Sequence, residues 1–351
     1  MTIGNSPGLS LDAARGAGVE ASLGPRSRKA QIAHFLQRDG VGALVVLVVF
    51  ATFASISVSG FGSAENLRNI LINVSFPAII AIGMTIVIIS GGIDLSVGSV
   101  FALAAILSTK VLDTNKGWGR GMLLALVLSL GAALLIGVVQ GLLVARVGLP
   151  PFIVTLAGLY GIRGLVFYVS HNGDDVYAAP PGGTFYKLGQ SKLFTLHYAV
   201  WIAVALYLVF HVVLTRTSFG LTTFAIGGSE DASSLMGLKV RPTKARLYVT
   251  SAGLAGLAGV LSAAYSQSGT PDVGRGFELN AIAAVVIGGT LLTGGAGSLI
   301  GTAAGVLLLG VVQSYINLGT SLPQAAQQVV TGVFVIGVVI VQRYLNRVQR
   351  R

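Results

Sequence analysis

Long apolar stretches separated by short polar segments make up the chain from residue 41 onward. A helix needs about 20 apolar residues to cross a bilayer, and ten stretches approach that length. They lie near residues 41–59, 70–90, 97–113, 121–145, 150–170, 198–215, 247–268, 281–293, 298–317 and 324–342. The eighth is too short for a full span, so we expect it to enter the membrane only partway or to be broken.

Two glycine pairs interrupt this pattern, namely Gly91-Gly92 and Gly294-Gly295. Each pair is expected to end one helix before another begins, because glycine readily adopts the backbone conformations that terminate helices. We therefore predict an all-α, polytopic helical membrane protein of about ten transmembrane helices. Broken or re-entrant segments would lie near 91–96 and 288–297, within a single transmembrane domain over 41–342.

Composition and charge support a membrane location. The chain has 53% hydrophobic and 10% charged residues, well below the roughly 25% charged residues of soluble domains. Its net charge of +11 does not indicate nucleic-acid binding, because the Lys and Arg residues sit at the ends of apolar runs rather than in one stripe. Their distribution favours cytoplasmic N- and C-termini by the positive-inside rule.

Polar, basic segments flank the apolar region at both ends. Residues 1–40 are Gly-rich and predict a disordered cytoplasmic tail, and residues 343–351 predict a basic cytoplasmic C-terminal tail. A secretory signal is the competing interpretation of the N-terminus, but the run over 41–59 exceeds the usual length of an h-region. Residues 171–197 are rich in turn formers and predict an extracytoplasmic loop, either a plain connector or a docking surface.

The sequence offers no apparatus for catalysis. There is no cysteine, which excludes a disulfide framework and cysteine-based metal or redox sites, and the four histidines lack metal-ligand spacing. No Gly-Lys dipeptide occurs, so the chain has no P-loop for nucleotide hydrolysis. We predict no enzyme activity, no metal site and no cofactor bound by this chain. Active transport would draw on an ion gradient or on another subunit.

Asp94 lies in GGIDLSVGS over 91–99, within the apolar part of the chain. Placing a charged carboxylate at membrane depth costs at least ~2.5 kcal/mol of insertion free energy. One interpretation is structural: Asp94 or Ser96 caps a helix that begins near Val97. The other is that Asp94 also lines or gates a path. Arg163 is a second charge within a span, for which snorkelling to the outer headgroups is favoured over pairing with Asp94.

Polar and aromatic side chains within the spans are candidates for a translocation path. As a set they favour a neutral polar substrate over an ion, although interhelical hydrogen bonds explain individual members equally well. The candidates are Asn73, Tyr160, Tyr265, Gln267, Asn280, Gln313, Tyr315 and Asn317.

The predicted cytoplasmic loop over 216–246 contains AIGGSEDASSLMGLKVRPTKAR. We expect a short helix over Glu230 to Leu238, ended by Gly237, with Pro242 blocking its renewal. The apolar Leu235, Met236 and Leu238 suit docking onto a cytoplasmic partner, whereas a solvated connector would not need them.

Four segments together resemble the permease subunits of bacterial ABC-type monosaccharide importers of the ribose class. They are GMTIVIISGGIDLSVGS, PFIVTLAGLYGIRGL, AIGGSEDASSLMGL and ELNAIAAVVIGGTLLTGG, within a similarity over residues 65 to 345. IRGLVFYVS and VVQSYINLGT are most similar to one permease of galactofuranose importers. The resemblance implies a type II importer-like fold in the bacterial inner (plasma) membrane.

The same resemblance implies partners and a coupling segment. It implies a second permease subunit, in a homo- or heterodimer, ATP-binding subunits that use ATP and Mg, and a periplasmic sugar-binding protein. By motif, Glu230, Asp231, Ala232, Met236 and Gly237 correspond to the segment that contacts the ATPase. We therefore expect an ATP-driven sugar importer subunit, with a gradient-driven carrier or facilitator for a small polar solute as the alternative.

Overall fold

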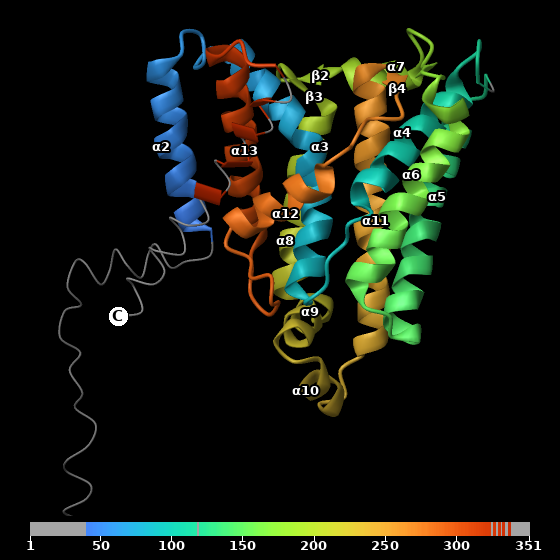
Figure 1. Ribbon diagram of the computed structural model, residues 1–351, viewed down its shortest axis with the longest axis vertical. Helices are drawn as coiled ribbons and strands as arrows, with labels where there is room; N and C mark the ends of the chain where they lie inside the picture. The colour runs from blue at the N-terminus through green and yellow to red at the C-terminus, as the bar shows by residue number, and fades with distance from the viewer. Residues whose placement is uncertain are drawn as a thin grey trace, which may run out of the picture.

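The computed structural model describes residues 40–117, 119–323 and parts of 326–337. Helices dominate these residues, which confirms the helical membrane fold, and most of them run side by side (Figure 1). The helices are α2 (Val41–Ser57), α3 (Ala64–Ile89), α4 (Val97–Leu112), α5 (Met122–Leu142), the π-helical η1 (Leu143–Val147), α6 (Pro151–Val169), the 3-10 turn η2 (His171–Gly173), α7 (Thr184–Gln190), α8 (Tyr198–Arg216), α9 (Ser218–Gly228), α10 (Glu230–Leu235), α11 (Val240–Ser266), α12 (Phe277–Ile287) and α13 (Leu299–Gly319).

Each of the first nine predicted spans corresponds to a helix. Among the described residues, six helices are long and apolar enough to cross a membrane, and α2, α4 and α12 are shorter. The 11 residues of α12 confirm that the eighth stretch is short. The tenth stretch, over 324–342, lies largely outside the described residues, and so do the predicted tails, so the total of ten stays a prediction.

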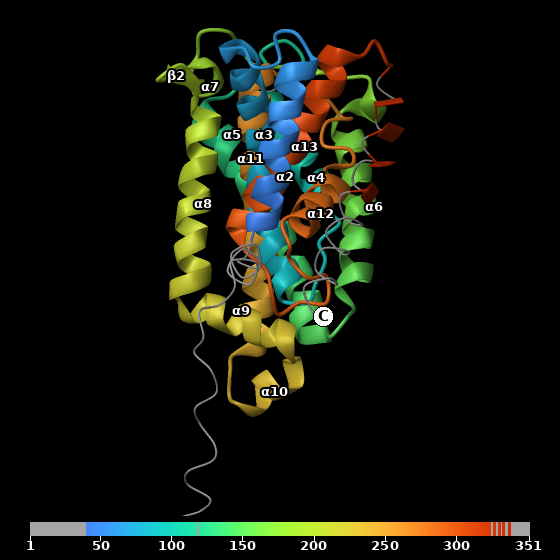
Figure 2. The same cartoon turned by 90° about the vertical axis from the view of Figure 1, so that its left-hand side faces the viewer.

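The bundle has two different ends (Figures 1 and 2). Helices α9 and α10 project beyond one of them, here called the α10 end. At the opposite α7 end, β1 (Tyr177–Ala178) pairs antiparallel with β4 (Ser268–Gly269), and β2 (Lys192–Leu193) pairs with β3 (Leu196–His197). The predicted loop over 171–197 is therefore folded onto the segment that follows α11.

Helices α3, α4 and α11 form the centre of the bundle, where most of their side chains are buried, whereas α5, α6 and α8 lie at the periphery. Glycines bring neighbouring helices of the bundle into close contact. A β-carbon at Gly259 of α11 would overlap the carbonyl oxygen of Phe101 in α4, and one at Gly137 of α5 would lie 2.7 Å from Val249 Cα. Such packing through small residues suits helices in lipid, where no hydrophobic force drives association.

Helix α3 crosses the whole bundle and connects its two ends. Ser63 is its N-cap and accepts a hydrogen bond from the Asn66 amide at 3.2 Å. Pro77 lies inside the helix. Helix α3 ends at Ile89, and Gly91 follows with a φ of +82°, a left-handed conformation that favours glycine. The predicted break over 91–96 is thus present, between α3 and α4.

Candidate functional site

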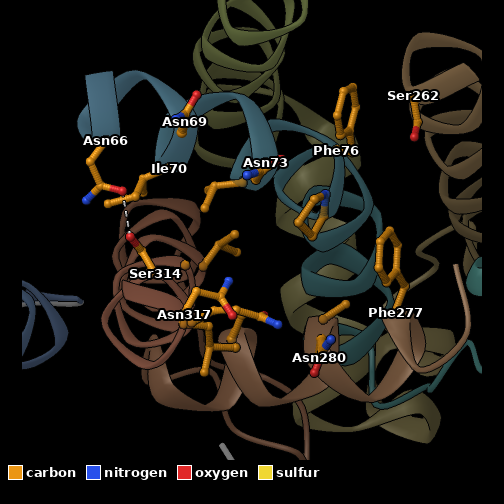
Figure 3. A pocket seen from close by; sticks show the side chains of 18 of the residues that line it. Asn66, Asn69, Ile70, Asn73, Phe76, Ser262, Phe277, Asn280, Ser314 and Asn317 are labelled. Atoms are coloured by element: carbon orange, nitrogen blue, oxygen red, sulfur yellow. Dashed lines mark hydrogen bonds between the residues drawn. The ribbon is translucent and has the colours of Figure 1, made fainter. Parts of the chain in front are cut away.

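A cavity of about 550 Å³ lies between α3, α11, α12 and α13 (Figure 3). Its largest chemical feature is a set of six side-chain amides. They are those of Asn66, Asn69, Asn73, Asn280, Gln313 and Asn317.

Helical spacing explains why these amides converge. Residues three, four and seven apart share one face of a helix, which places Asn66, Asn69 and Asn73 together on α3 and Gln313 with Asn317 on α13.

One of the six amides links two walls of the cavity. Asn66 Oδ1 accepts a hydrogen bond from Ser314 Oγ at 2.9 Å, which ties α3 to α13 (Figure 3), and its Nδ2 donates to the Phe61 carbonyl at 2.8 Å. The other five side-chain amides make no hydrogen bond to any described residue. Their donors and acceptors are available to a ligand.

Aromatic rings supply the apolar walls. The rings of Phe76 and Tyr265 lie 5.9 Å apart, and Tyr265 is held on another side by His197, whose ring meets it edge-on at 5.1 Å. Phe277 packs at 5.1 Å against the ring of Phe101. No charged side chain is among the described residues that line the cavity. Flat apolar faces beside neutral amides match a solute that carries hydroxyl groups and C–H faces.

Pro77 leaves one backbone carbonyl of α3 without its regular donor. Proline has no amide hydrogen, so it cannot donate to the carbonyl of Asn73, four residues earlier in α3. Both residues line the cavity. The Asn73 carbonyl therefore lacks its regular helical donor, in a residue that lines the cavity.

Five of the eight predicted path residues line the cavity, namely Asn73, Tyr265, Asn280, Gln313 and Asn317. The other three lie elsewhere. Tyr160 is 70% exposed on the outer face of α6. Gln267 follows α11 and donates its side-chain amide to the Ala264 carbonyl. Tyr315 faces α2, where its ring packs edge-on against Phe50 at 5.7 Å.

Several lining residues were missed by the sequence prediction. The missed polar and aromatic residues are Asn66, Asn69, Phe76, Ser262, Phe277 and Ser314. The predicted span begins near residue 70, whereas α3 begins at Ala64, so the polar first turns of α3 lie outside the predicted span. The helical spacing of the three asparagines was a usable signal. The two phenylalanines could not be told from core residues by sequence.

Asp94 forms a buried bridge rather than a helix cap. Its Oδ1 accepts hydrogen bonds from Ser96 N at 3.0 Å and Ser96 Oγ at 2.6 Å, and its Oδ2 accepts from Ser251 Oγ at 2.8 Å. Helix α4 begins at Val97 as predicted, but Ser96 makes no side-chain cap and Asp94 reaches only the cap residue itself. The capping prediction was therefore wrong in its partners. The carboxylate ties the α3–α4 turn to α11, and it does not line the cavity.

Arg163 also differs from its predicted role. Its guanidinium donates to the carbonyls of Pro271 and Val273, both at 3.0 Å, and of Gly98 at 3.2 Å. It does not snorkel to the headgroups, because protein carbonyls satisfy it within the bundle. Since residues 271–273 lead directly into α12, Arg163 holds the start of the helix that carries Phe277 into the cavity.

The predicted helix-breaking glycines occupy two turns at the α10 end. Gly91, Gly294 and Gly295 have φ values of +82°, +86° and +77°. Gly92 is required for space, because a β-carbon there would lie 2.5 Å from the Tyr248 hydroxyl. Both predicted breaks are therefore present, the second in the turn between α12 and α13.

The loop predicted to dock a partner folds into α9 and α10. Ser229 caps α10 by accepting from the Ala232 amide at 3.3 Å, and Gly237 follows the helix with a φ of +77°. Helix α10 ends at Leu235, three residues earlier than predicted. Leu235 and Met236 are 90% and 71% exposed, whereas Leu238 is half-buried.

The contacts of this loop with α11 change two expectations. Glu230 forms a salt bridge with Lys244 Nζ at 2.9 Å, so part of its charge is used within the chain. Pro242 does not block a new helix. It lies in the first turn of α11, which begins at Val240, and a proline is tolerated there because its missing amide hydrogen has no helical partner.

A family model described as "Branched-chain amino acid transport system / permease component" matches residues 66–339. The chain belongs to this permease family. Among its curated relatives, the inner membrane ABC transporter permease YjfF of Escherichia coli is 38% identical over 301 residues, covering 82% of this permease and 86% of the relative.

Two further relatives carry sugars in their names. The L-arabinose transport permease AraH of Escherichia coli is 34% identical, covering 89% of this permease and 93% of the relative. The ribose import permease RbsC of Escherichia coli is 37% identical, covering 79% and 85%. No solved structure matches. This permease is thus a multi-span membrane subunit of the ABC sugar importer family and not an enzyme.

Proposed function

We propose that this permease forms half of the translocation path of an ATP-driven importer for a neutral monosaccharide. The cavity carries the proposal, because it combines available amides with aromatic faces and no charged lining among the described residues. Sugars need hydrogen-bond donors and acceptors together with apolar faces. Galactofuranose is the first candidate, on the resemblance of IRGLVFYVS and VVQSYINLGT, and arabinose and ribose are the next, on the names of the relatives.

The α10 end is proposed to face the cytoplasm and to dock an ATP-binding subunit that uses ATP and Mg. Leu235 and Met236 stand exposed beyond the bundle, beside the carboxylates of Glu230 and Asp231, and such a patch suits a protein partner. The α7 end would then meet a periplasmic binding protein. A second permease subunit would supply the other half of the path.

A gradient-driven carrier with Asp94 as its proton site receives less support. Asp94 lies outside the cavity and its oxygens are bonded to Ser96 and Ser251. A proton site on the path would be expected among the cavity-lining residues.

Sugar uptake by proteoliposomes that hold the permease pair, the ATPase and the binding protein tests the proposal. Uptake should require MgATP on the ATPase side and should persist when ion gradients are collapsed by ionophores. Uptake that needs no ATPase, or that stops on gradient collapse while ATP is maintained, would instead establish the carrier.

A further inference from the structure

Three glycine pairs, distant in sequence, meet at the α10 end of the bundle. They are Gly91-Gly92 after α3, Gly227-Gly228 at the end of α9 and Gly294-Gly295 between α12 and α13. Nothing in the sequence pattern linked the second pair to the other two.

The contacts among these turns are made by backbone. The Gly295 amide donates to the carbonyl of Ile89, the last residue of α3, at 2.8 Å. A β-carbon at Gly227 would overlap that same carbonyl and the Gly295 amide nitrogen. A β-carbon at Gly294 would lie 2.9 Å from Gly91 N and 3.0 Å from Gly227 Cα. We call the backbone contact of Ile89, Gly91, Gly227, Gly294 and Gly295 the glycine junction.

The elements that meet at the glycine junction lead to the cavity and to α10. Helix α9 leads directly into α10, since Gly228 is followed by the cap residue Ser229. Helix α3 carries Asn69 and Asn73 at its other end, and the 294–295 turn joins α12 to α13. Figure 1 shows α9 lying across the end of the bundle beside the end of α3. One cavity-lining helix, α3, therefore ends at the junction, and the turn that connects two others, α12 and α13, passes through it.

We infer that the glycine junction fixes α9, and with it α10, to the end of α3 and to the turn between α12 and α13. A displacement of α10 would then move the cavity-lining helices α3, α12 and α13 as one unit. Contact without side chains is stiff, because no flexible rotamer separates the backbones. The inference rests on the proposed function, since α10 is moved only if an ATPase docks there.

Two matched pairs of substitutions separate contact from backbone freedom. Gly227→Ala places a methyl group into the junction, whereas Gly228→Ala, one residue later, meets nothing within 4 Å. Gly294→Ala and Gly289→Ala have equal backbone strain, with φ of +86° and +91°, but only the former reaches the junction. The added methyl group overlaps its neighbours less in Gly294→Ala than in Gly227→Ala. Gly294→Ala therefore tests the inference if Gly227→Ala does not fold.

The sugar transported per ATP hydrolysed should fall between about twofold and thirtyfold in Gly227→Ala and Gly294→Ala, the range of coupling changes from single substitutions. It should stay at the wild-type value in Gly228→Ala and Gly289→Ala. Equal coupling in all four variants, or equal losses in all four, would overturn the inference.

Hydrogen exchange supplies a readout that does not depend on transport. The Gly295 amide should exchange faster in Gly227→Ala and Gly294→Ala than in their controls, because its bond to Ile89 is displaced. Unchanged exchange there would contradict the rigid junction. A wild-type complex that shows no ATP-driven uptake would refute the proposed function, and the exchange rates would still decide whether the junction exists.

Discussion

The Asp94 carboxylate and the Ser251 hydroxyl, 157 residues apart in sequence, are joined by a hydrogen bond of 2.8 Å in the buried centre of the bundle. Asp94 makes no ion pair with any described residue. Its role in the fold is that of a hydrogen-bond acceptor for Ser96 and Ser251. The bond joins α11, the helix that follows α10, to the turn after α3.

Asp94→Asn should therefore preserve folding, because the amide oxygen can accept from Ser96 and the amide nitrogen can donate to the Ser251 oxygen. Asp94→Ala should lower stability by about 1–3 kcal/mol for each buried donor left unsatisfied. Thermal unfolding of the purified protein checks both. An Asn variant as unstable as the Ala variant would show that the charge itself is required.

Arg163→Lys should destabilise the segment over residues 271–273, which precedes α12. A lysine ammonium cannot reproduce the planar fork that reaches the Pro271, Val273 and Gly98 carbonyls together. Hydrogen bonds to a charged group contribute about 1.5–3 kcal/mol each, so we expect a lower melting temperature and slower sugar uptake. The control is Arg275→Lys in the same loop, which keeps an exposed pair with Asp272. Equal melting temperatures and equal uptake rates in the two variants would contradict a positioning role for Arg163.

Asp113→Asn should loosen the folded loop at the α7 end. Burial opposes ionisation of Asp113, but the backbone amides of Lys116, Ala178, Asn115 and Gly117 outweigh it and lower the pKa of Asp113 below its usual range. A carboxylate with a lowered folded pKa stabilises above its unfolded pKa of about 3.9. That stabilisation is lost as the pH falls through the folded value.

Hydrogen exchange at Ala178, whose amide donates to Asp113 at 2.8 Å, measures this effect. Protection at pH 7 should drop in Asp113→Asn, because the Asn amide group offers one acceptor where the carboxylate offers two. Asp174→Asn is the matched control, since Asp174 is exposed in the same loop region. Equal protection in both variants would contradict the role given to Asp113.

The two acidic residues of α10 should differ in their response to charge reversal. Glu230→Lys faces Lys244 and breaks a pair worth at most about 1 kcal/mol, so its effect on coupled ATPase activity should be reversed by adding Lys244→Glu. Asp231→Lys should impair coupling and should not respond to Lys244→Glu, because Asp231 is exposed. Coupled ATPase rates of the reconstituted complex test this. Full activity of Asp231→Lys would remove Asp231 from the docking surface.

Sequence reasoning located most of the helices because hydropathy decides them. It misplaced the start of α3, where Asn66 and Asn69 face a cavity rather than lipid, and the start of α11, where Pro242 lies in a first turn that tolerates it. Local patterns of apolar residues do not show whether a polar residue ends a helix or faces a polar space inside it.

The site was harder to predict because it is made by tertiary contact. Five of the predicted path residues line the cavity, and their shared signal is a polar or aromatic side chain inside an apolar helix, but Tyr315 has the same local signature and faces α2. Gly227 showed no signal of its own. Its role follows from its contact with Ile89 and Gly295, which lie far away in sequence.

The rate of ATP-driven sugar uptake in proteoliposomes without an ion gradient tests the central claim most directly. The Asn73→Leu/Asn280→Leu double variant removes two of the available amides at nearly constant volume, and Tyr160→Phe, outside the cavity, is the control. We predict that uptake falls about tenfold or more in the double variant, since each lost hydrogen bond contributes about 1 kcal/mol, while Tyr160→Phe transports like the wild type. Wild-type uptake by the double variant would contradict the account.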